Sequence, residues 1–246
     1  MHSWLKLTWV ETKLFLREPG AYFALAFPIV LLVIFGAIYG NTPNAFLGGH
    51  GSLDFYVPAY IAILMIIIGF YSLPIAIINY RERGVLFRLQ ATPLRPLAIL
   101  SAQIGANFVM TTAGAIILVI AGRLFYNLHV IGSMPSVLLA YLLGVLSIFA
   151  LGFLVASVVP NVRVASVVGT LLFFPMLYLS GATVPLKIYP QTVQQIAQFL
   201  PLTHVVTLMQ NMWFGGSWLD NWGNVFALLG ILVVCLLVSV RLFRWR

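Results

Sequence analysis

Residues 55–79 read FYVPAYIAILMIIIGFYSLPIAIIN, an uninterrupted run without a single charged side chain. About 20 apolar residues in a helix cross the ~30 Å hydrocarbon core of a bilayer. One charge at the centre of such a helix would cost roughly 2.5–3.5 kcal/mol on insertion scales. The run is therefore long enough and apolar enough to span a membrane, which favours an integral membrane protein over a water-soluble domain.

The rest of the chain has the same character. The hydrophobic fraction is 62% and the mean hydropathy is +1.05, whereas soluble domains use roughly 45–50% apolar residues. The ~10-residue alternating segments of a transmembrane barrel are not found in the sequence. We predict an all-α protein with six membrane spans, at about 21–40, 55–79, 97–120, 136–159, 164–185 and 222–242.

The basic residues predict how the spans are oriented. An even number of spans places both termini on one side of the membrane. Eleven of the 13 Lys and Arg residues then lie on the side of the termini, and Arg123 and Lys187 lie on the other. Because basic residues are retained on the cytoplasmic side, we expect cytoplasmic termini and a location in the plasma (inner) membrane. The basic residues form no stripe, so we expect no nucleic-acid partner.

The first 20 residues are expected to form a separate N-terminal segment ahead of a transmembrane domain at 21–246. Residues 3–18 have a helical pattern that is too polar to cross a membrane, and Lys6, Lys13 and Arg17 share one face. Such a helix can lie in the interface with its basic edge near lipid phosphates. The alternative is a plain cytosolic leader whose charges only set the topology.

The segment between the fifth and sixth spans, 186–222, contains two short helical patterns, VQQIAQFL and THVVTLMQNMWF, separated by Pro201. Both are too brief to span. Short apolar helices on the outside either dip into the membrane or cap a cavity. The alternative is an interfacial loop anchored by Trp213, Trp218 and Trp222.

Motifs for catalysis, phosphate binding and metal binding are missing. The sequence has no G-x-x-x-x-G-K-[ST], H-E-x-x-H, C-x-x-C or G-x-S-x-G pattern, and its four histidines are far apart. The carboxylates lie at or outside span ends, whereas ion-coupled carriers usually place one within the membrane. We expect no catalytic residue, no metal site and no cofactor in this chain, so that energy for any transport comes from a partner.

Charge is concentrated in residues 80–96, YRERGVLFRLQATPLRP, which hold five of the 18 charged residues. Val85 and Leu89 share one side of a short predicted helix, and Arg81 and Arg88 share another. Residues 92–93 then supply an N-cap and a first-turn proline for the third span. An apolar side flanked by arginines suits docking into a groove of a soluble partner. The alternative is charge that only fixes the topology.

The same loop resembles the cytoplasmic loop of the ATP-binding-cassette (ABC) type-2 permeases, whose usual form is E-R-E-x-G-T-L-x-x-L-x-x-T-P. LSGATVP at 179–185 and LPLTHVV at 200–206 resemble that family's later signature, which here comprises Ser180, Gly181, Pro185, Pro201 and His204. The order and spacing of the motifs match over nearly the whole chain. The sequence departs from the pattern at Val85, where Thr is common, and at residues 80–81, where Glu-Arg is common.

The resemblance implies a dimer of permease chains, identical or different, each bound to a separate ABC ATPase subunit that holds ATP and Mg²⁺. The ATPase would bind a coupling helix that maps to Arg81, Glu82, Arg83, Gly84, Val85, Leu86, Phe87, Arg88 and Leu89. The chain itself would not be an enzyme. It would export a hydrophobic or amphipathic substrate such as a drug, antibiotic or lipid.

Two alternatives to this function remain. One is export of a polysaccharide or lipid-linked glycan, which would favour a wide aromatic-lined channel, whereas the aromatic residues are dispersed along the sequence. The other is a membrane scaffold or channel without an ATPase.

The third predicted span contains a polar stripe, which follows from the residues without the family resemblance. Gln103, Asn107 and Thr111 are spaced four apart, so they share one helix face. A polar face avoids lipid, and it serves either helix–helix hydrogen bonding or contact with a substrate. Gly152 and Ala156 form a small-residue pair that permits close helix packing.

Overall fold

The computed structural model describes residues 2–43, 49–85 and 96–242 of the chain. The described residues are helical, as predicted, and six of their helical segments are long and apolar enough to cross a membrane. The main elements are α1 (His2–Phe15), α2 (Pro19–Tyr39), α3 (Ser52–Met65), η2 (Ile66–Ser72), α4 (Leu73–Glu82), α6 (Pro96–Tyr126), α7 (Met134–Val158), α8 (Val162–Leu179), α9 (Gln191–Ala197), α10 (Pro201–Trp213) and α11 (Trp222–Leu242).

The second span is the centre of the bundle. It runs without a break through α3, η2 and α4. In its most apolar stretch of 18 residues, 78% of the residues are buried, against 28% for the span of α2 and 17% for the span of α11. This span contacts α2, α6, α7, α8 and α10. Its 31 residues make a helix of about 46 Å, which exceeds the ~30 Å hydrocarbon core. The end of α4 therefore projects beyond the apolar part of the bundle.

A π-helical turn, η2, lies in the middle of this span. At its level α7 approaches closely enough that a Cβ on Gly152 would lie 1.9 Å from the carbonyl oxygen of Gly69. Gly152 is thus required for the backbones to touch, and a Cβ on Gly69 would lie 2.2 Å from the ring of Phe149. This contact agrees with the small-residue pairing predicted for Gly152 and Ala156, both of which are buried.

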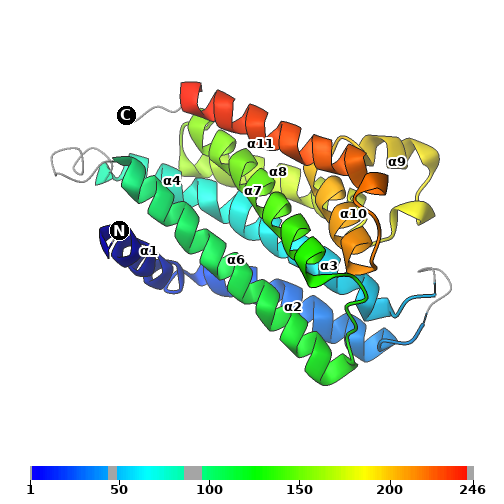
Figure 1. The fold of residues 1–246 in the computed structure, drawn as a ribbon. Helices are drawn as coiled ribbons and strands as arrows, with labels where there is room; N and C mark the ends of the chain where they lie inside the picture. The colour runs from blue at the N-terminus through cyan, green and yellow to red at the C-terminus, as the bar shows by residue number, and fades with distance from the viewer. Residues whose placement is uncertain (1, 44–48, 86–95, 243–246) are drawn as a thin grey trace.

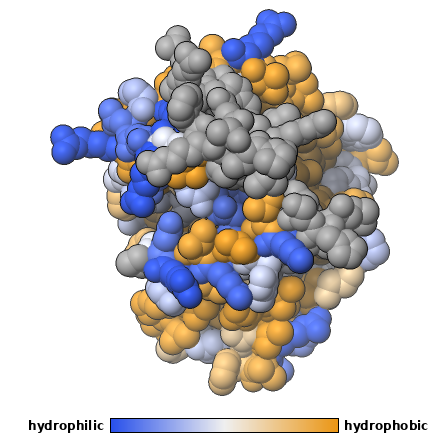
Figure 2. Space-filling model, turned by 90° about the vertical axis from the view of Figure 1, so that its left-hand side faces the viewer, coloured by the Kyte–Doolittle hydropathy of each residue, from blue (hydrophilic) through white to orange (hydrophobic). Residues whose placement is uncertain are grey.

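The two ends of the bundle differ in the helices and the basic residues found there. The start of α1, the end of α4 and the end of α11 lie together at the left of Figure 1, whereas α9 and α10 lie at the opposite end. Hydrophilic side chains are interspersed with apolar ones over the left-hand end (Figure 2). The described basic residues of that end are Lys6, Lys13, Arg17, Arg81, Arg83, Arg163 and Arg241.

The helix α1 packs alongside the first half of α6. Its inward face consists of Thr8, Thr12 and Phe15, which are buried, while Val10 and Leu14 are exposed. The face that contacts the protein is therefore partly polar, and the apolar side chains of Val10 and Leu14 point away from the bundle.

The two short helices predicted between the last spans are present as α9 and α10. The helix α10 buries its apolar face against α3, α7 and α11, so it packs inside the bundle and does not lie flat on its surface. Trp213 is 2% exposed, and its indole Nε1 donates to the carbonyl oxygen of His129 at 3.1 Å. The interpretation of Trp213 as an exposed interfacial anchor is wrong, because α10 turns this side chain into the core.

The predicted fifth span, 164–185, ends earlier than expected. The helix α8 stops at Leu179, because Gly181 adopts a left-handed φ of +86° that an α-helix cannot contain. Residues 180–185 form a turn at the end of α8.

The charge asymmetry predicts which end of the bundle faces the cytoplasm. On a Cys235→Ala background, a membrane-impermeant thiol reagent applied to intact cells should label Gln191→Cys, at the start of α9, and should spare Gln90→Cys. Both variants replace a glutamine with cysteine, so the two substitutions are chemically the same. Labelling of Gln90→Cys from outside would reverse the orientation.

Candidate functional site

The base of the predicted coupling helix lies at the end of α4. Of the nine residues assigned to that helix, the structure describes Arg81 to Val85, and Leu86, Phe87, Arg88 and Leu89 lie outside the described residues. Gly84 has a φ of +65°, a left-handed conformation that glycine adopts without steric cost. It follows α4 as a C-terminal turn, in which its N–H donates to the carbonyl oxygen of Arg81.

The side chain of Arg81 binds the end of α7. Its Nη1 donates to the carbonyl oxygen of Ala156 at 3.3 Å, and its Nη2 donates to the carbonyl oxygens of Val159 and Pro160, the latter at 3.1 Å. The last carbonyls of a helix have no partner within the helix. A guanidinium, with five N–H donors in a fixed fork, can satisfy several of them at once.

The side chain of Glu82 binds the beginning of α8. Its Oε1 accepts the backbone N–H of Val162 at 2.9 Å, and Asn161 accepts the N–H of Val164 at 2.9 Å as the N-cap. A carboxylate at a helix N-terminus pairs with free N–H groups and with the positive end of the helix dipole. Arg81 and Glu82 therefore bind the two sides of the same turn, between the fourth and fifth spans.

The preceding residue, Tyr80, binds α1. Its hydroxyl donates to Oε2 of Glu11 at 2.8 Å. Burial raises the pKa of the Glu11 carboxyl above its ordinary value, and the hydrogen bond from Tyr80 acts in the opposite direction. Three consecutive residues, Tyr80, Arg81 and Glu82, thus attach α4 to α1, α7 and α8. We refer to these three residues as the α4 clamp.

The later signature lies at the opposite end of the bundle. In the turn after α8, Ser180 Oγ accepts the N–H of Ala182 at 3.3 Å, and Thr183 donates to the carbonyl oxygen of Leu177 at 3.1 Å. Ser180, Gly181 and Pro185 line a cavity of about 350 Å³ together with Thr207, Gln210 and Asn211 of α10. Three signature residues therefore share one cavity wall.

The remaining signature residues hold α10 in place. Pro201 is the first residue of α10, where its missing N–H has no cost. The ring nitrogens of His204 lie 2.9 Å from Asn224 Oδ1 and 2.9 Å from the carbonyl oxygen of Gln198. His204 thus connects α10 to the start of α11 and to the turn after α9.

A model of the ABC-2 type transporter family matches residues 2–214, from α1 through α10. The chain belongs to the ABC-2 type transporter family. Two relatives that the chain resembles are the inner membrane transport permease YhhJ of Escherichia coli (strain K12) and that of Shigella flexneri. Each is 25% identical over 173 residues, which cover 69% of this chain and 46% of the relative. The chain thus spans about half the length of these curated relatives.

Members of this family are membrane subunits of transporters and work with ABC ATPase partners in the membrane. The region around the α4 clamp falls within the family match. The described residues contain no group of three or more His, Cys, Asp or Glu side chains that could hold a metal ion. At this end of the bundle, hydrogen bonds of the α4 clamp join α4 to α1, α7 and α8.

The polar stripe of the third span is buried. Gln103, Asn107 and Thr111 are 7%, 1% and 0% exposed. Asn107 Nδ2 donates to the carbonyl oxygen of Gln103 and Thr111 to that of Asn107, both at 2.8 Å within α6. Among the described residues, Gln103 Oε1 and Asn107 Oδ1 have no hydrogen-bond partner. Helix pairing and substrate contact therefore remain as alternatives for these two oxygens.

We expect Arg81→Ala to lower the stability of the protein. The change leaves carbonyl oxygens at the end of α7 without a partner, at a cost of about 1–3 kcal/mol for each such group that is buried. The measurement is thermal unfolding of the purified protein in detergent. Arg83→Ala is the matched control, because Arg83 is exposed and exposed substitutions usually change stability by about 0.5 kcal/mol or less. Equal melting temperatures would contradict the structural role of Arg81.

We expect Gln103→Leu and Asn107→Leu to unfold at the same temperature as the wild type or a higher one. Each change removes a buried oxygen without a partner, and replacement of such a group by an apolar one is neutral or stabilising. Transport or resistance profiles across several substrates provide the second measurement. A profile that shifts while protein level and melting temperature hold would assign the stripe to the substrate path, and an unchanged profile would assign it to helix packing.

Proposed function

We propose that this chain is the permease subunit of an ATP-driven exporter. Two copies form the transmembrane pathway, each copy binds a separate ABC ATPase through residues 81–89, and both termini face the cytoplasm. The substrate is hydrophobic or amphipathic, such as a drug, antibiotic or lipid. ATP and Mg²⁺ are held by the ATPase subunit.

The observation that carries this proposal is the α4 clamp. A loop that receives force from an ATPase must have a base that moves with the spans. Here the base connects to three other helices through hydrogen bonds of Tyr80, Arg81 and Glu82. A displacement of the loop therefore acts on α1, on the end of α7 and on the start of α8 together. Charge that only set the topology would need no such attachments.

A groove beside the middle of the central span favours an amphipathic substrate and assembly with a second copy of the chain. It has a volume of about 610 Å³ and lies between α2, η2 and α8, and its lining residues Phe23, Phe174 and Tyr178 are more than half exposed. Six aromatic residues line it, namely Phe23, Phe27, Tyr71, Phe173, Phe174 and Tyr178. We refer to it as the aromatic groove. A second copy placed against α2 and α8 would close it into a pathway.

The same groove also favours the glycan alternative. The sequence suggested that the aromatic residues are dispersed, but the fold gathers six of them in one place. Sugar rings can pack on aromatic faces, but buried sugar hydroxyls also need hydrogen-bonding partners. The rest of the lining is mainly apolar, with Ser72 and Thr170 as its small polar side chains. Because the lining is mainly apolar, it favours a hydrophobic or amphipathic substrate over a glycan.

The proposal predicts that Phe87→Ala lowers the affinity of the permease for the ATPase without unfolding the permease. Truncation of a well-packed apolar anchor costs about 2 kcal/mol or more, roughly thirtyfold in affinity. The measurement is co-purification with a co-expressed cassette ATPase in detergent, together with substrate-stimulated ATP hydrolysis. Phe125→Ala is the control, because Phe125 is exposed at the other end of α6.

Glu82→Ala separates the two roles of this loop. Since Glu82 caps α8, its removal should lower the melting temperature as well as ATPase binding, whereas Phe87→Ala should lower binding alone. Undiminished co-purification and ATP hydrolysis in the Glu82→Ala/Phe87→Ala double variant would reduce the loop to a topology signal.

A further inference from the structure

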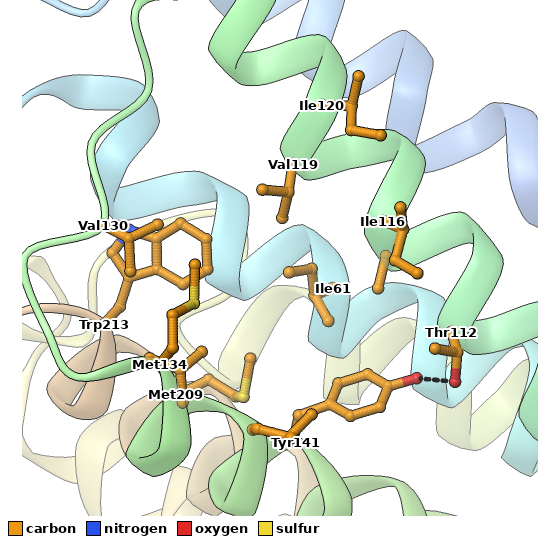
Figure 3. Close-up of a pocket in the computed structure, with 13 residues that line it drawn as sticks. Ile61, Thr112, Ile116, Val119, Ile120, Val130, Met134, Tyr141, Met209 and Trp213 are labelled. Atoms are coloured by element: carbon orange, nitrogen blue, oxygen red, sulfur yellow. Dashed lines mark hydrogen bonds between the residues drawn. The ribbon is translucent and has the colours of Figure 1, made fainter.

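The helices α6 and α7 are consecutive spans joined by the short connection 127–133, yet they make few contacts with each other. The helix α6 packs against α1, α2 and α3, whereas α7 packs against α11, α10 and η2. Short connections usually produce antiparallel neighbours that pack together. Here a groove of about 290 Å³ lies between the two helices (Figure 3). We refer to it as the α6–α7 groove.

The floor and the rim of this groove differ in exposure. The floor consists of Ile61, Ala115, Val137, Tyr141, Met209 and Trp213, each less than 10% exposed. The rim consists of Ile116 and Ile120 from α6 and Met134 and Leu138 from α7, each more than half exposed. The groove is therefore open on its side, between two membrane spans, where lipid chains surround the protein.

The polar atoms in the lining are already paired. Tyr141 Oη and Thr112 Oγ1 lie 2.9 Å apart at one end of the groove (Figure 3), and Thr112 also donates to the carbonyl oxygen of Phe108 at 2.8 Å. At the other end Trp213 Nε1 donates to the carbonyl oxygen of His129. A polar ligand group would find no free partner here and would lose its own hydration. The lining thus suits a purely apolar ligand.

The groove occupies one half of the membrane thickness. Thr112 lies near the middle of the third span, Leu100–Tyr126, and Ile120 lies about 12 Å further along α6 at 1.5 Å per residue. Met134, on the opposite rim, is the first residue of α7. The groove therefore runs from the middle of the bilayer to its surface at the α10 end. This length is close to half of the ~30 Å hydrocarbon core, which is the extent of one acyl chain of a single leaflet.

We propose that the α6–α7 groove binds one acyl chain of a membrane phospholipid, from the leaflet at the α10 end of the bundle. An empty apolar groove would leave its lining atoms without dispersion contacts, and an apolar cavity of about 150 Å³ already binds benzene. The groove shares no lining residue with the aromatic groove, so the lipid site and the aromatic groove are separate sites.

The test uses the full-length protein reconstituted in vesicles that contain a phospholipid with a diazirine on one acyl chain. After illumination, peptide mapping should locate the label on residues 116–120 and 134–141. The variant Ile116→Trp places an indole over the groove, and the label at these residues should be lost. Ile117→Trp is the matched control, because Ile117 is the adjacent residue on α6, is similarly exposed and lies outside the lining.

Leu138→Trp fills the groove from the α7 side and should reproduce the loss, which keeps the test valid if Ile116→Trp does not fold. Native mass spectrometry should find one phospholipid retained per chain in the wild type and in Ile117→Trp, but none in the two filling variants. Equal labelling of the exposed face of α11 would indicate ordinary lipid contact and overturn the proposal. Labelling unchanged by both filling variants, or a cross-link between two copies at these residues, would also overturn it.

Discussion

The backbone carbonyls at the end of α7 have no partner within their own helix, and the guanidinium of Arg81 supplies one from a different span. This pairing determines how the polar end of the bundle is assembled. The last carbonyls of a helix need partners from outside the helix, and each buried carbonyl left unpaired costs about 1–3 kcal/mol. Placing the partner on α4 makes the end of α7 and the start of α8 depend on the position of the central span.

The central span is also the most buried one, so two properties meet in a single helix. Its middle is held by apolar packing against five other helices, and its end is held by the directed hydrogen bonds of the α4 clamp. Packing fixes where the helix lies, and the hydrogen bonds fix its rotation and its register relative to α1 and α8. A loop extending from such a helix has a defined starting point even when its own residues contribute nothing to the fold.

Much of the fold follows from the sequence, because hydropathy over 20 residues is a local property. Six spans, two short outer helices and a tight packing position at Gly152 could all be predicted in this way. The N-cap Asn161 was not predicted, although Asn between a proline and an apolar run is a helix-start signal. The aromatic groove could not be predicted, because Phe23, Tyr71 and Phe173 come from three different spans.

The contacts of the α4 clamp also could not be predicted from the sequence. Arg81 and Glu82 were assigned to a partner surface, and the structure adds internal contacts to residues about 80 positions away. A basic residue near a span end has the same local appearance whether it faces lipid phosphate, a partner protein or a helix end. Trp213 illustrates the same limit, since tryptophan near a membrane surface usually anchors there but here is buried by a helix that folds back into the bundle.

The π-helical turn η2 links the α4 clamp to the aromatic groove. Such turns are rare and are frequent at functional sites, and η2 lies where the central span contributes Ile67, Tyr71 and Ser72 to the aromatic groove. Tyr71 also packs over Gly169 of α8, where a Cβ would lie 2.8 Å from its ring. One continuous helix thus carries the α4 clamp at its end and a wall of the aromatic groove at its middle, and α8 contacts both. Under the proposed coupling to an ATPase, a rotation of α4 would reach the groove through η2 and through α8, without any intervening loop to absorb it.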